Sequence, residues 1–316
     1  MLELRALTLK QLRALDAVAE YGTMTQAADS LGLTTPAIHN QLKILSQNLG
    51  SDVLERTPTG RFRLTKEAEI LRLSHQKAQT AFQRAILDID ALRRGVAGSV
   101  SLGVVSTAKY FAPGIVAELN RLHPEIEIQL VVGNRQEVIE GLESEALDLA
   151  IMGRPPRQPM VDARTLGDHP HILACSTGDP LAGQTKPSLD ELFSRKIILR
   201  EPGSGTRILA HRFLDQLGRG RTYTTIEMES NETIKQSVMA GLGIALLSAH
   251  TLIEELHAGR IALIPLRNLP IIRQWFLLHR QDLRMTGAIE KIRADILADA
   301  ARMIRLEDVK AALGTV

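Results

Sequence analysis

Small and amide side chains gather at the start of a predicted helix near residue 35. Thr35-Pro36 is typical of a helix start, because threonine caps free backbone amides and proline fits the first helical turn. If Ile38, Leu42 and Leu45 pack inward, the opposite face of this helix is exposed. Asn and Gln can make paired hydrogen bonds to adenine, and a small side chain can contact the thymine methyl group. We therefore predict contacts to DNA bases from Thr34, Thr35, Pro36, Ala37, His39, Asn40 and Gln41.

Cationic side chains follow in a segment that has the character of a small hairpin. Pro58 and Gly60 precede an alternating run, Arg-Phe-Arg-Leu at 61–64, and this pattern predicts two short strands with a basic tip. Lysine and arginine at such positions contact phosphates or the minor groove, which sets affinity rather than sequence preference. We assign this role to Lys43, Arg56, Arg61 and Arg63. A three-helix packing unit with solvated charges is the alternative that these residues leave open.

A second group of polar and cationic side chains follows predicted strands later in the chain. Strand ends in an open α/β sheet point into the crevice where ligands bind, and helix N-termini there attract anions. Several arginines at such positions favour a phosphate or a carboxylate as the ligand. The predicted ligand-binding residues are Ser106, Thr107, Lys109, Asn134, Arg135, Gly153, Arg154, Arg200, Ser204, Thr206, Asn231 and Thr233. The alternative for Ser106 and Thr107 is ordinary helix capping, and the glycine-rich run 201–207 is a weak phosphate signal without structural context.

Short helices position the first of these groups. Apolar residues recur at helical spacing over residues 9–19, and Tyr21-Gly22 ends that helix. Thr23 and Gln26 form a capping box for a second helix, which is followed by a turn at Gly32. Two helices joined by a tight turn allow the second to lie in the major groove of DNA. Residues 1–65 are therefore predicted to form a winged helix-turn-helix.

A long uninterrupted helix is predicted over residues 66–92, which contain neither Gly nor Pro. Its apolar positions alternate at spacings of four and three, which is the pattern of a two-stranded coiled coil. This stripe comprises Leu71, His75, Ala78, Phe82, Ala85, Ile89 and Leu92. We therefore predict a homodimer through this helix. The alternative is a single helix that lies on its own domain.

Predicted strands alternate with helices beyond a hinge at Gly95 and Gly98, which indicates parallel sheet covered by helices. The first set has strands at 100–105, 126–132 and 147–152 and helices at 110–122 and 136–145. The second set has strands at 172–175, 197–199, 224–228, 244–247 and 261–266 and helices at 206–216 and 233–240. A late strand at 271–278 and a final helix at 286–303 are predicted to return to the first set. Together they predict an α/β domain with two lobes.

The composition and the missing motifs exclude several other classes. Hydrophobic residues make up 44% and charged residues 23% of the 316 residues, and the formal net charge is +2, all ordinary for globular protein. No apolar run is long enough to span a membrane or to serve as a signal peptide, so we expect a cytoplasmic protein without membrane contact. The single cysteine, Cys175, excludes an internal disulfide and is expected to be buried.

Catalysis is not expected from this sequence. It contains no phosphate-binding loop with Gly-Lys-Ser/Thr, no His-Glu-x-x-His and no Gly-x-Ser-x-Gly elbow. His169 and His171 form a close pair, but no carboxylate-and-cysteine cluster accompanies them. We therefore expect no enzyme activity, no cofactor and no metal site.

The run 9–65 resembles the N-terminal domain of the LysR-type transcriptional regulators. The motifs that carry the resemblance are Ala27-Ala28-Asp29-Ser30-Leu31, Thr35-Pro36-Ala37, Leu49-Gly50, Leu54-Glu55-Arg56 and Arg63-Leu64-Thr65. The order of elements resembles that family over nearly the whole chain. The resemblance implies a DNA-binding regulator with a two-lobed, periplasmic-binding-protein-like α/β domain for an effector. His39 departs from the family's usual serine, and Ser46-Gln47-Asn48 replaces a commonly acidic stretch, which leaves the role of His39 open.

Three further runs resemble one branch of the family, called CbbR, which regulates carbon dioxide fixation (RuBisCO, Calvin cycle) operons. They are residues 106–113, 132–135 and 150–156. The likeness implies a phosphorylated or nucleotide effector and a homotetramer on double-stranded promoter DNA, with RNA polymerase as a further candidate partner. Alternatives that stay open are a LysR-type regulator of another operon that senses a carboxylate, a solute-binding protein and a purely architectural DNA binder.

These observations predict five segments. They are a winged helix-turn-helix at 1–65, a linker helix for dimerisation at 66–94, a first lobe at 95–166 and 268–303, a second lobe at 167–267 and a C-terminal tail at 304–316.

Overall fold

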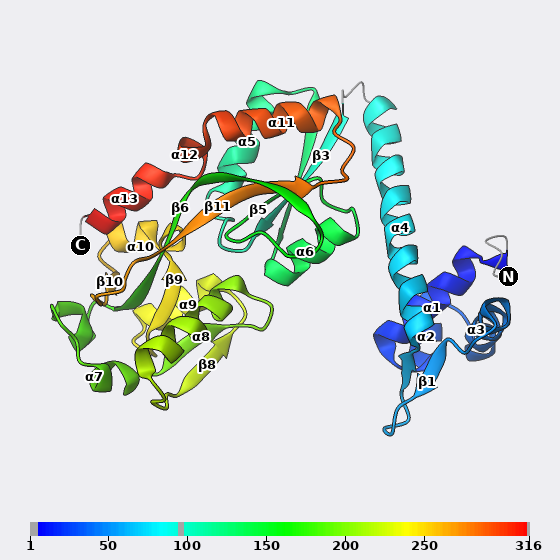
Figure 1. Ribbon diagram of the computed structural model, residues 1–316, viewed down its shortest axis with the longest axis horizontal. Coiled ribbons are helices and arrows are strands. Elements are labelled where there is room, and N and C mark those ends of the chain that lie inside the picture. The colour runs from blue at the N-terminus through cyan, green and yellow to red at the C-terminus, as the bar shows by residue number, and fades with distance from the viewer. Residues whose placement is uncertain (1–5, 94–97, 315–316) are drawn as a thin grey trace. The chain divides into compact units, whose positions relative to one another are not determined.

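The computed structural model describes residues 6–93 and 98–314, apart from the side chains of residues 84, 87, 88 and 90–92. The predicted boundary at 94/95, with Gly95, lies outside this range. The chain divides into two compact units, Met1–Arg84 and Ala85–Val316, which we call the N-terminal unit and the C-terminal unit (Figure 1).

The N-terminal unit begins with three helices, α1 (Leu9–Tyr21), α2 (Met24–Leu31) and α3 (Thr35–Leu49). Gly32 ends α2 with a left-handed backbone, φ 63°, which lets the chain turn directly into α3. The helices enclose a core whose fully buried members include Leu15, Ile38 and Leu45. The predicted helix-turn-helix is confirmed.

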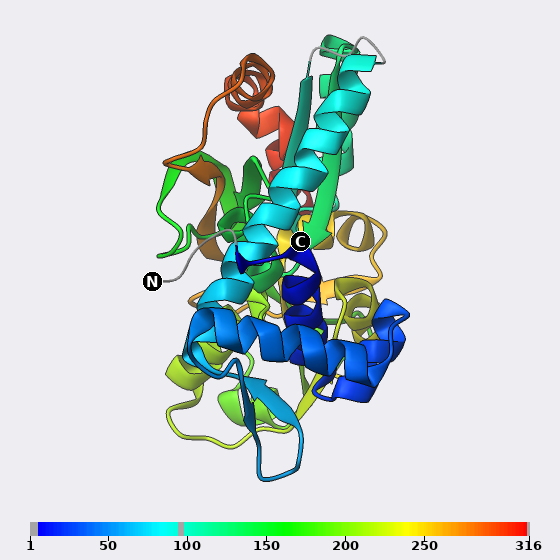
Figure 2. The same cartoon turned by 90° about the vertical axis from the view of Figure 1, so that its right-hand side faces the viewer.

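A small hairpin follows α3. Its strands β1 (Leu54–Arg56) and β2 (Phe62–Leu64) pair antiparallel, with Leu54 opposite Leu64. Val53 and Leu64 are buried in the core of the three helices and anchor the hairpin there. The tip of the hairpin protrudes from the helices (Figure 2).

Helix α4 (Lys66–Arg93) has the predicted length, but the first part of its apolar stripe serves its own unit. Leu71 packs against the core of the three helices. His75 is buried, and its Nδ1 lies 2.7 Å from Oδ2 of Asp16 in α1. At these two positions the coiled-coil interpretation is wrong, because the neighbouring helix already covers them.

Further along α4, large apolar side chains are exposed. Phe82 and Ile89 of the predicted stripe are 58% and 50% exposed, and Ile86 beside them is 65% exposed. Ile70 and Leu73 are exposed as well. The side chain of Leu92 lies outside the described residues. A partner helix would cover such side chains, so dimerisation through α4 stays a prediction.

The first lobe of the C-terminal unit is built on three parallel strands, β3 (Gly98–Val105), β4 (Ile126–Gly133) and β5 (Leu149–Met152). Helices α5 (Ala112–Leu122) and α11 (Gly287–Ala298) cover one face of this sheet, and α6 (Arg135–Glu143) covers the other. Successive residues of these strands therefore point alternately into two hydrophobic cores, one on each face of the sheet. Leu102 and Leu149 belong to the first, and Ala150 and Met152 to the second.

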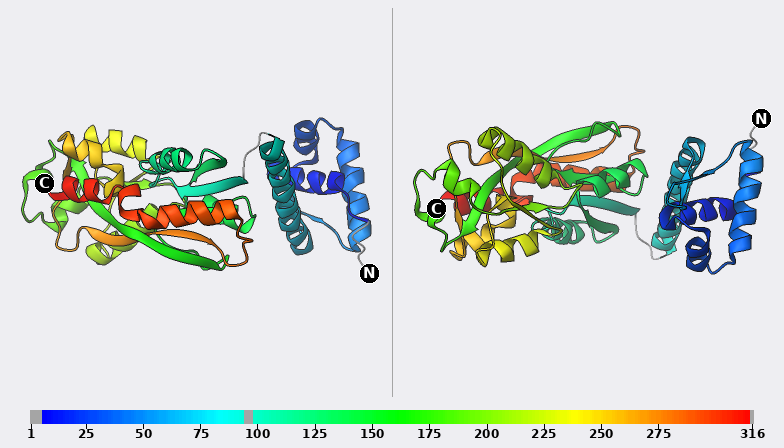
Figure 3. Two further views of the ribbon diagram at one scale, coloured as in Figure 1. Left: turned by 90° about the horizontal axis from the view of Figure 1, so that it is seen from above. Right: turned by 90° about the horizontal axis from the view of Figure 1, so that it is seen from below.

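Two long antiparallel strands, β6 (Val161–Ser176) and β11 (Ile271–Arg280), run from the first lobe into the second (Figure 3). β11 also pairs with β5, so both strands belong to one sheet with the order β10-β6-β11-β5-β3-β4, and β9 pairs with β6. The sequence predicted β6 only at 172–175, and this start is wrong. Gly167, Asp168 and Pro170 hide the strand pattern, whereas pairing with β11 supplies its hydrogen bonds.

The second lobe adds four short strands, β7 (Ile197–Arg200), β8 (Thr225–Met228), β9 (Ala245–Ser248) and β10 (Ile261–Leu263). Its helices are α7 (Leu189–Phe193), α8 (Gly205–Gly218), α9 (Asn231–Met239) and α10 (Ile253–His257). Helices α7 and α8 pack on one face of the strands, and α9 and α10 on the other. Cys175 is fully buried between the strands and α8, as expected.

The C-terminal end of the chain differs from the prediction. The final helix breaks at Asp299 into α11 and a short α12 (Ala300–Met303). The residues expected to form a tail include helix α13 (Leu306–Gly314), whose Val309 and Ala312 are fully buried in the core of the second lobe. The short apolar pattern of this segment did not lead to a helix prediction, although Val309 and Ala312 lie at helical spacing. In the residues that the structure describes, no helix combines the length and apolar character needed to cross a bilayer.

Candidate functional site

Helix α3 presents the predicted base-reading residues on its outer face. Ile38, Leu42 and Leu45 are buried, as the spacing predicts. The capping threonine is Thr34 and not the predicted Thr35, which is the first residue of the helix; the Thr34 hydroxyl accepts a hydrogen bond from the backbone amide of Ala37. The exposed side chains are Thr34, Thr35, Pro36, His39, Asn40 and Lys43, while Ala37 and Gln41 are half-buried. Both amide side chains therefore lie outside the core, which is a condition of base contact.

The hairpin of the same unit carries three exposed arginines, Arg56, Arg61 and Arg63. Arg63 is paired with Glu55 across the strands at 2.8 Å, so part of its charge is compensated. Arg56 lies over the ring of Phe62, 5.3 Å from its centroid. Among the described side chains of residues 6–93, Arg56, Arg61 and Lys43 have no ion-pair partner, so their charges are available for phosphates.

The C-terminal unit contains a cavity of about 400 Å³ where β6 and β11 cross between the lobes. The structure brings seven of the predicted ligand-binding residues together in its lining: Ser106, Thr107, Arg135, Gly153, Arg154, Ser204 and Thr206. Ser106 and Thr107 follow β3, and Ser204 and Thr206 stand at the start of α8, so both lobes contribute. The predicted convergence of strand ends at one crevice is thus present for these seven.

The cavity also contains functional candidates that the sequence reasoning missed. They are Arg212 on α8, Arg273 and Gln274 on β11, and His169 and His171 on β6. Arg212 shares a helix face with Gly205, Ile208 and Leu209, and this helical spacing could have identified it. The β6 and β11 residues could not be found without the pairing of the two strands.

The charged side chains that line this cavity in the described part of the chain are all cationic. Four arginines line it, Arg135, Arg154, Arg212 and Arg273, and no carboxylate is among the lining residues in the described part of the chain. Burial and the nearby Arg154 lower the pKa of Arg135. Arg135 donates to the backbone oxygen of Arg154 at 2.9 Å, which brings these like charges together. An anion between them would relieve that repulsion.

His169 and His171 also line the cavity, but they add no positive charge to it. The His169 ring stacks on Trp275 with centroids 3.7 Å apart, and its Nε2 lies 2.9 Å from Oγ of Ser248. Burial lowers the pKa of His171 to about 4 and that of the neighbouring His250 to about 3, and it also lowers the pKa of His169. These imidazoles are therefore neutral near pH 7, and the cationic character comes from the arginines. Within residues 6–93 and 98–314, no group of three or more metal-ligating side chains is found.

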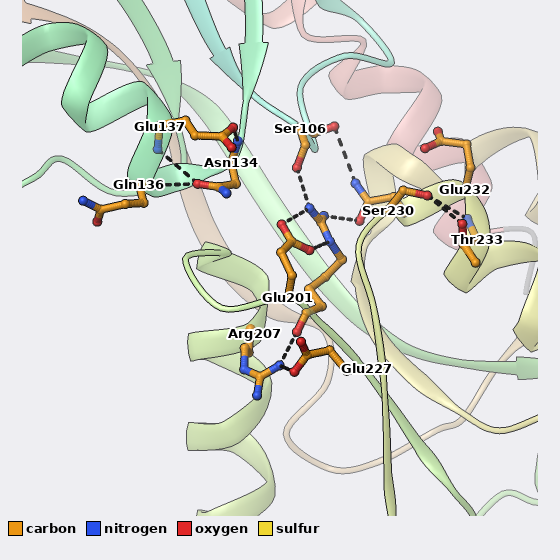
Figure 4. A network of polar contacts seen from close by, with 12 residues as sticks. Ser106, Asn134, Gln136, Glu137, Glu201, Arg207, Glu227, Ser230, Glu232 and Thr233 are labelled. Atoms are coloured by element: carbon orange, nitrogen blue, oxygen red, sulfur yellow. Dashed lines mark hydrogen bonds and ion pairs between the residues drawn. The ribbon is translucent and has the colours of Figure 1, made fainter. Parts of the chain in front are cut away.

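The structure places five predicted ligand-binding residues elsewhere. Asn134 and Thr233 take part in helix caps: Asn134 caps α6 through the amides of Gln136 and Glu137, and the Thr233 amide donates to Ser230 at the start of α9 (Figure 4). Both positions follow strands, but the Asn134 side-chain oxygen is used by backbone amides, and the Thr233 hydroxyl is paired with that of Ser230.

The other three lie in contacts between the lobes. Lys109 forms an ion pair with Glu232 of α9, and the Tyr110 hydroxyl donates to the same carboxylate at 2.5 Å. Arg200 is buried and pairs with Glu201, and one of its amino groups reaches Asn231. The sequence did not predict these ion pairs. Glu232, the partner of Lys109, lies on a distant segment. Glu201 is adjacent to Arg200, but sequence alone does not show that the two side chains pair.

Two protein families match the chain, one for each unit. Residues 9–69 match the helix-turn-helix domain described as bacterial regulatory helix-turn-helix protein, lysR family. Residues 93–301 match the LysR substrate binding domain. The predicted family is confirmed over most of the chain, and so is the predicted fold class.

Similar proteins carry names that agree with the predicted branch. The transcriptional regulator CbbR of Cereibacter sphaeroides is 45% identical over 308 residues, which cover 95% of this chain and 99% of the relative. CbbR of Xanthobacter flavus is 42% identical, with 89% of this chain and 84% of the relative covered. The regulatory domain of CcmR from Synechocystis PCC6803, solved in complex with 2-PG, is 28% identical with a TM-score of 0.61, covering 65% of this chain and 99% of that one.

These names are those of transcriptional regulators, which agrees with the expectation of a regulator rather than an enzyme. The extent of the two family matches settles the assignment. The chain belongs to the LysR family of bacterial DNA-binding transcriptional regulators.

Proposed function

We propose that this regulator controls carbon dioxide fixation genes in response to a small, phosphorylated anion bound between the lobes. The single observation that carries the effector class is the cavity lined by four arginines and no carboxylate. A neutral ligand would leave the half-buried Arg135 and its three more exposed neighbours without a counter-charge, whereas a phosphate accepts paired hydrogen bonds from guanidinium groups.

The start of α8 supports an anion in the same cavity. Ser204 is the N-cap of this 14-residue helix, yet its side chain makes no cap hydrogen bond. Ser204 and Thr206 are 3% and 7% exposed and both line the cavity. The free backbone amides of a helix N-terminus and nearby hydroxyls are donors that suit phosphate oxygens. The anion thus has donors from the second lobe as well as arginines from the first.

The relatives support both the effector and the genes. The CcmR regulatory domain was solved with 2-PG, and the relatives at 45% and 42% identity are CbbR proteins. A relative at 35% identity is named a RuBisCO operon transcriptional regulator. We extend these properties to this chain, which then acts in the cytoplasm on promoter DNA.

For the DNA, we propose that Asn40, Gln41 and their neighbours on α3 contact base edges, and that Lys43, Arg56 and Arg61 contact phosphates. Exposure of the amide side chains and the unpaired cations of this unit support these roles. The exposed Phe82, Ile86 and Ile89 of α4 support a homodimer through that helix. We further propose a homotetramer, a dimer of such dimers, that presents paired DNA-binding units and meets RNA polymerase at the promoter.

Titration calorimetry on the full-length protein tests the effector class. The ligands are 2-PG, inorganic phosphate, a carboxylate of matched size without phosphate, and an uncharged polyol. We expect heat from 2-PG and inorganic phosphate and none from the polyol, because only the anions compensate the arginines. Binding of the carboxylate alone would change the effector class to carboxylates, and binding of the polyol alone would refute an anionic effector.

Anisotropy titrations test the DNA role in parallel. The protein is titrated with a fragment of the promoter upstream of the carbon dioxide fixation genes and with random DNA of equal length, at the same salt concentration. A specific regulator prefers its operator by about 10³-fold or more. Equal affinity for both fragments would contradict control of these genes.

A further inference from the structure

Arg200 has its charge fully compensated within the second lobe. Its side chain is 3% exposed, and it forms a two-pronged pair with Glu201: Nε to Oε2 at 2.6 Å and Nη2 to Oε1 at 2.7 Å. A third group, Nη1, donates to Oδ1 of Asn231 at 2.6 Å. Unlike the four arginines of the cavity, Arg200 thus has no free charge to offer an anion.

One hydrogen bond of Arg200 crosses between the lobes. Its Nη2 donates to Oγ of Ser106 at 3.1 Å. Ser106 follows β3 in the first lobe, whereas Arg200 ends β7 in the second. Asn231, at the start of α9, adds a longer hydrogen bond of 3.5 Å to the Ser106 backbone oxygen. Figure 4 shows Ser106 and Glu201 joined by dashed lines to the same guanidinium group.

This contact excludes one direction for the Ser106 hydroxyl proton, the direction toward Arg200. A guanidinium group can only donate, so Oγ of Ser106 must act as the acceptor. The single hydroxyl proton of the serine therefore points away from Arg200. Since Ser106 also lines the cavity, that proton is available to an acceptor oxygen there.

The position of Arg200 is itself fixed by a second arginine. Arg207 of α8 donates to the backbone oxygen of Arg200 at 2.5 Å and pairs with Glu227 of β8 at the same distance. With Glu201 and Asn231 on its side chain and Arg207 on its backbone, Arg200 has little freedom to turn into the cavity.

We propose that Arg200 is a positioning residue that presents the Ser106 hydroxyl as a donor to the effector. Because the contact joins the two lobes, the hydroxyl is oriented only at the lobe arrangement seen here, and effector affinity is coupled to that arrangement. The ligand oxygen must be an acceptor, as in a phosphate or a carboxylate. The inference rests on the proposed effector cleft.

A neighbouring contact offers a matched control. Glu232, which follows Asn231 in α9, joins Lys109 and Tyr110 of the first lobe. It therefore bridges the same two segments without bonding to Ser106. Glu232→Gln weakens the lobe contact while leaving the Arg200 to Ser106 hydrogen bond in place, and so it separates hydroxyl orientation from general loosening.

The test is a double-mutant cycle on the full-length protein, with binding of 2-PG and of inorganic phosphate measured by calorimetry. The variants are Ser106→Ala, the charge-balanced pair Arg200→Met with Glu201→Gln, and all three changes together. The paired change avoids leaving Glu201 as an unpartnered carboxylate. Thermal unfolding of each variant confirms that it is folded.

We expect Ser106→Ala and the Arg200→Met/Glu201→Gln pair each to weaken binding about tenfold, as for one hydrogen bond to an anion. The combined variant should lose no more than either alone, because both changes remove the same oriented proton. Glu232→Gln should lose less than about threefold. Unchanged binding in the Arg200 variant, additive losses in the combined variant, or an equal loss in Glu232→Gln would each overturn the proposal. A wild-type protein that binds neither probe would overturn the effector cleft itself, and the inference with it.

Discussion

The outer face of α3 and the cavity between the lobes are assembled in different ways. The face of α3 comes from one continuous helix, in which Ile38, Leu42 and Leu45 turn inward and Asn40 turns outward. The cavity draws side chains from the ends of β3 and β5, from the starts of α6 and α8, and from the middle of β6 and β11. Each side chain on α3 therefore depends on its neighbours in sequence, whereas the cavity depends on how distant segments pair.

The two regions also differ in how deeply their titratable groups are buried. The cations on the outer face of α3 and on the hairpin are exposed, as are Arg154, Arg212 and Arg273 of the cavity, and salt screens the fields of such exposed charges. In the cavity, burial lowers the pKa of Arg135 and keeps three nearby histidines neutral. Changes in the cavity should therefore have larger effects than changes on α3.

The largest effect is expected from pH, and only in the C-terminal unit. The unfolded chain protonates His171 and His250 near pH 6.5, but the folded pKa values are about 4 and about 3. The unfolded state thus binds more protons below pH 6.5, and the free energy of unfolding falls as pH falls towards 4. Each histidine contributes up to about 1.4 kcal/mol per pH unit, and above pH 6.5 this dependence vanishes.

Calorimetric unfolding between pH 7.5 and 4.5 measures this slope. His171→Asn should reduce it, because the asparagine has no group that titrates in this range. A transition of the C-terminal unit that is independent of pH would contradict the buried neutral histidines.

The next effect concerns the arginines of the cavity. Arg135→Ala combined with Arg154→Ala should weaken 2-PG binding by about 100-fold or more, since each arginine supplies about 1.5–3 kcal/mol of charged hydrogen bonding. Affinity for promoter DNA should not change, because these arginines line the cavity of the other unit. Calorimetry and anisotropy titrations measure the two. Arg121→Ala, an exposed arginine of α5, is the control, and an equal loss there would refute a specific role for the cavity.

A smaller effect is expected on the outer face of α3. Asn40→Ala should cost about 1–3 kcal/mol in binding to promoter DNA and little in binding to random DNA, because an amide reads a base edge. The matched control is Gln47→Ala near the exposed end of the same helix. Losses of the same size on both DNA fragments would show that Asn40 contributes no sequence preference.

The smallest effect is expected from single phosphate contacts. Lys43→Ala or Arg61→Ala should weaken binding to promoter and random DNA alike and lower the salt dependence of the binding constant by about one unit of slope. Arg63→Ala should change the slope less, because Glu55 already pairs with Arg63. Titrations at several salt concentrations measure the slopes, and a slope that stays at the wild-type value would exclude phosphate contact at that residue.

The helical spacing in residues 9–65 was enough to predict which side of α3 is buried and where the hairpin lies. Local signals such as Pro36 and Gly32 fix helix starts and turns through short-range backbone preferences, although the cap itself is Thr34, one residue before the predicted Thr35. Seven of the predicted ligand residues lie in the cavity for a related reason: strand ends are recognisable in sequence, and parallel strands bring their ends to one edge.

Only the tertiary structure decided which of the predicted ligand-binding arginines are left without a carboxylate partner. Arg200 and Arg135 both follow predicted strands, but Arg200 is neutralised by Glu201 and turned towards Ser106, whereas Arg135 faces the cavity beside Arg154. His169, Arg273 and Gln274 enter the cavity through the pairing of β6 with β11, two segments far apart in the chain. The sequence determined local conformation because capping and periodicity act over a few residues. It could not determine charge compensation, because which carboxylate pairs with a cation is decided by side-chain packing, whether that carboxylate is distant, as Glu232 is from Lys109, or adjacent, as Glu201 is to Arg200.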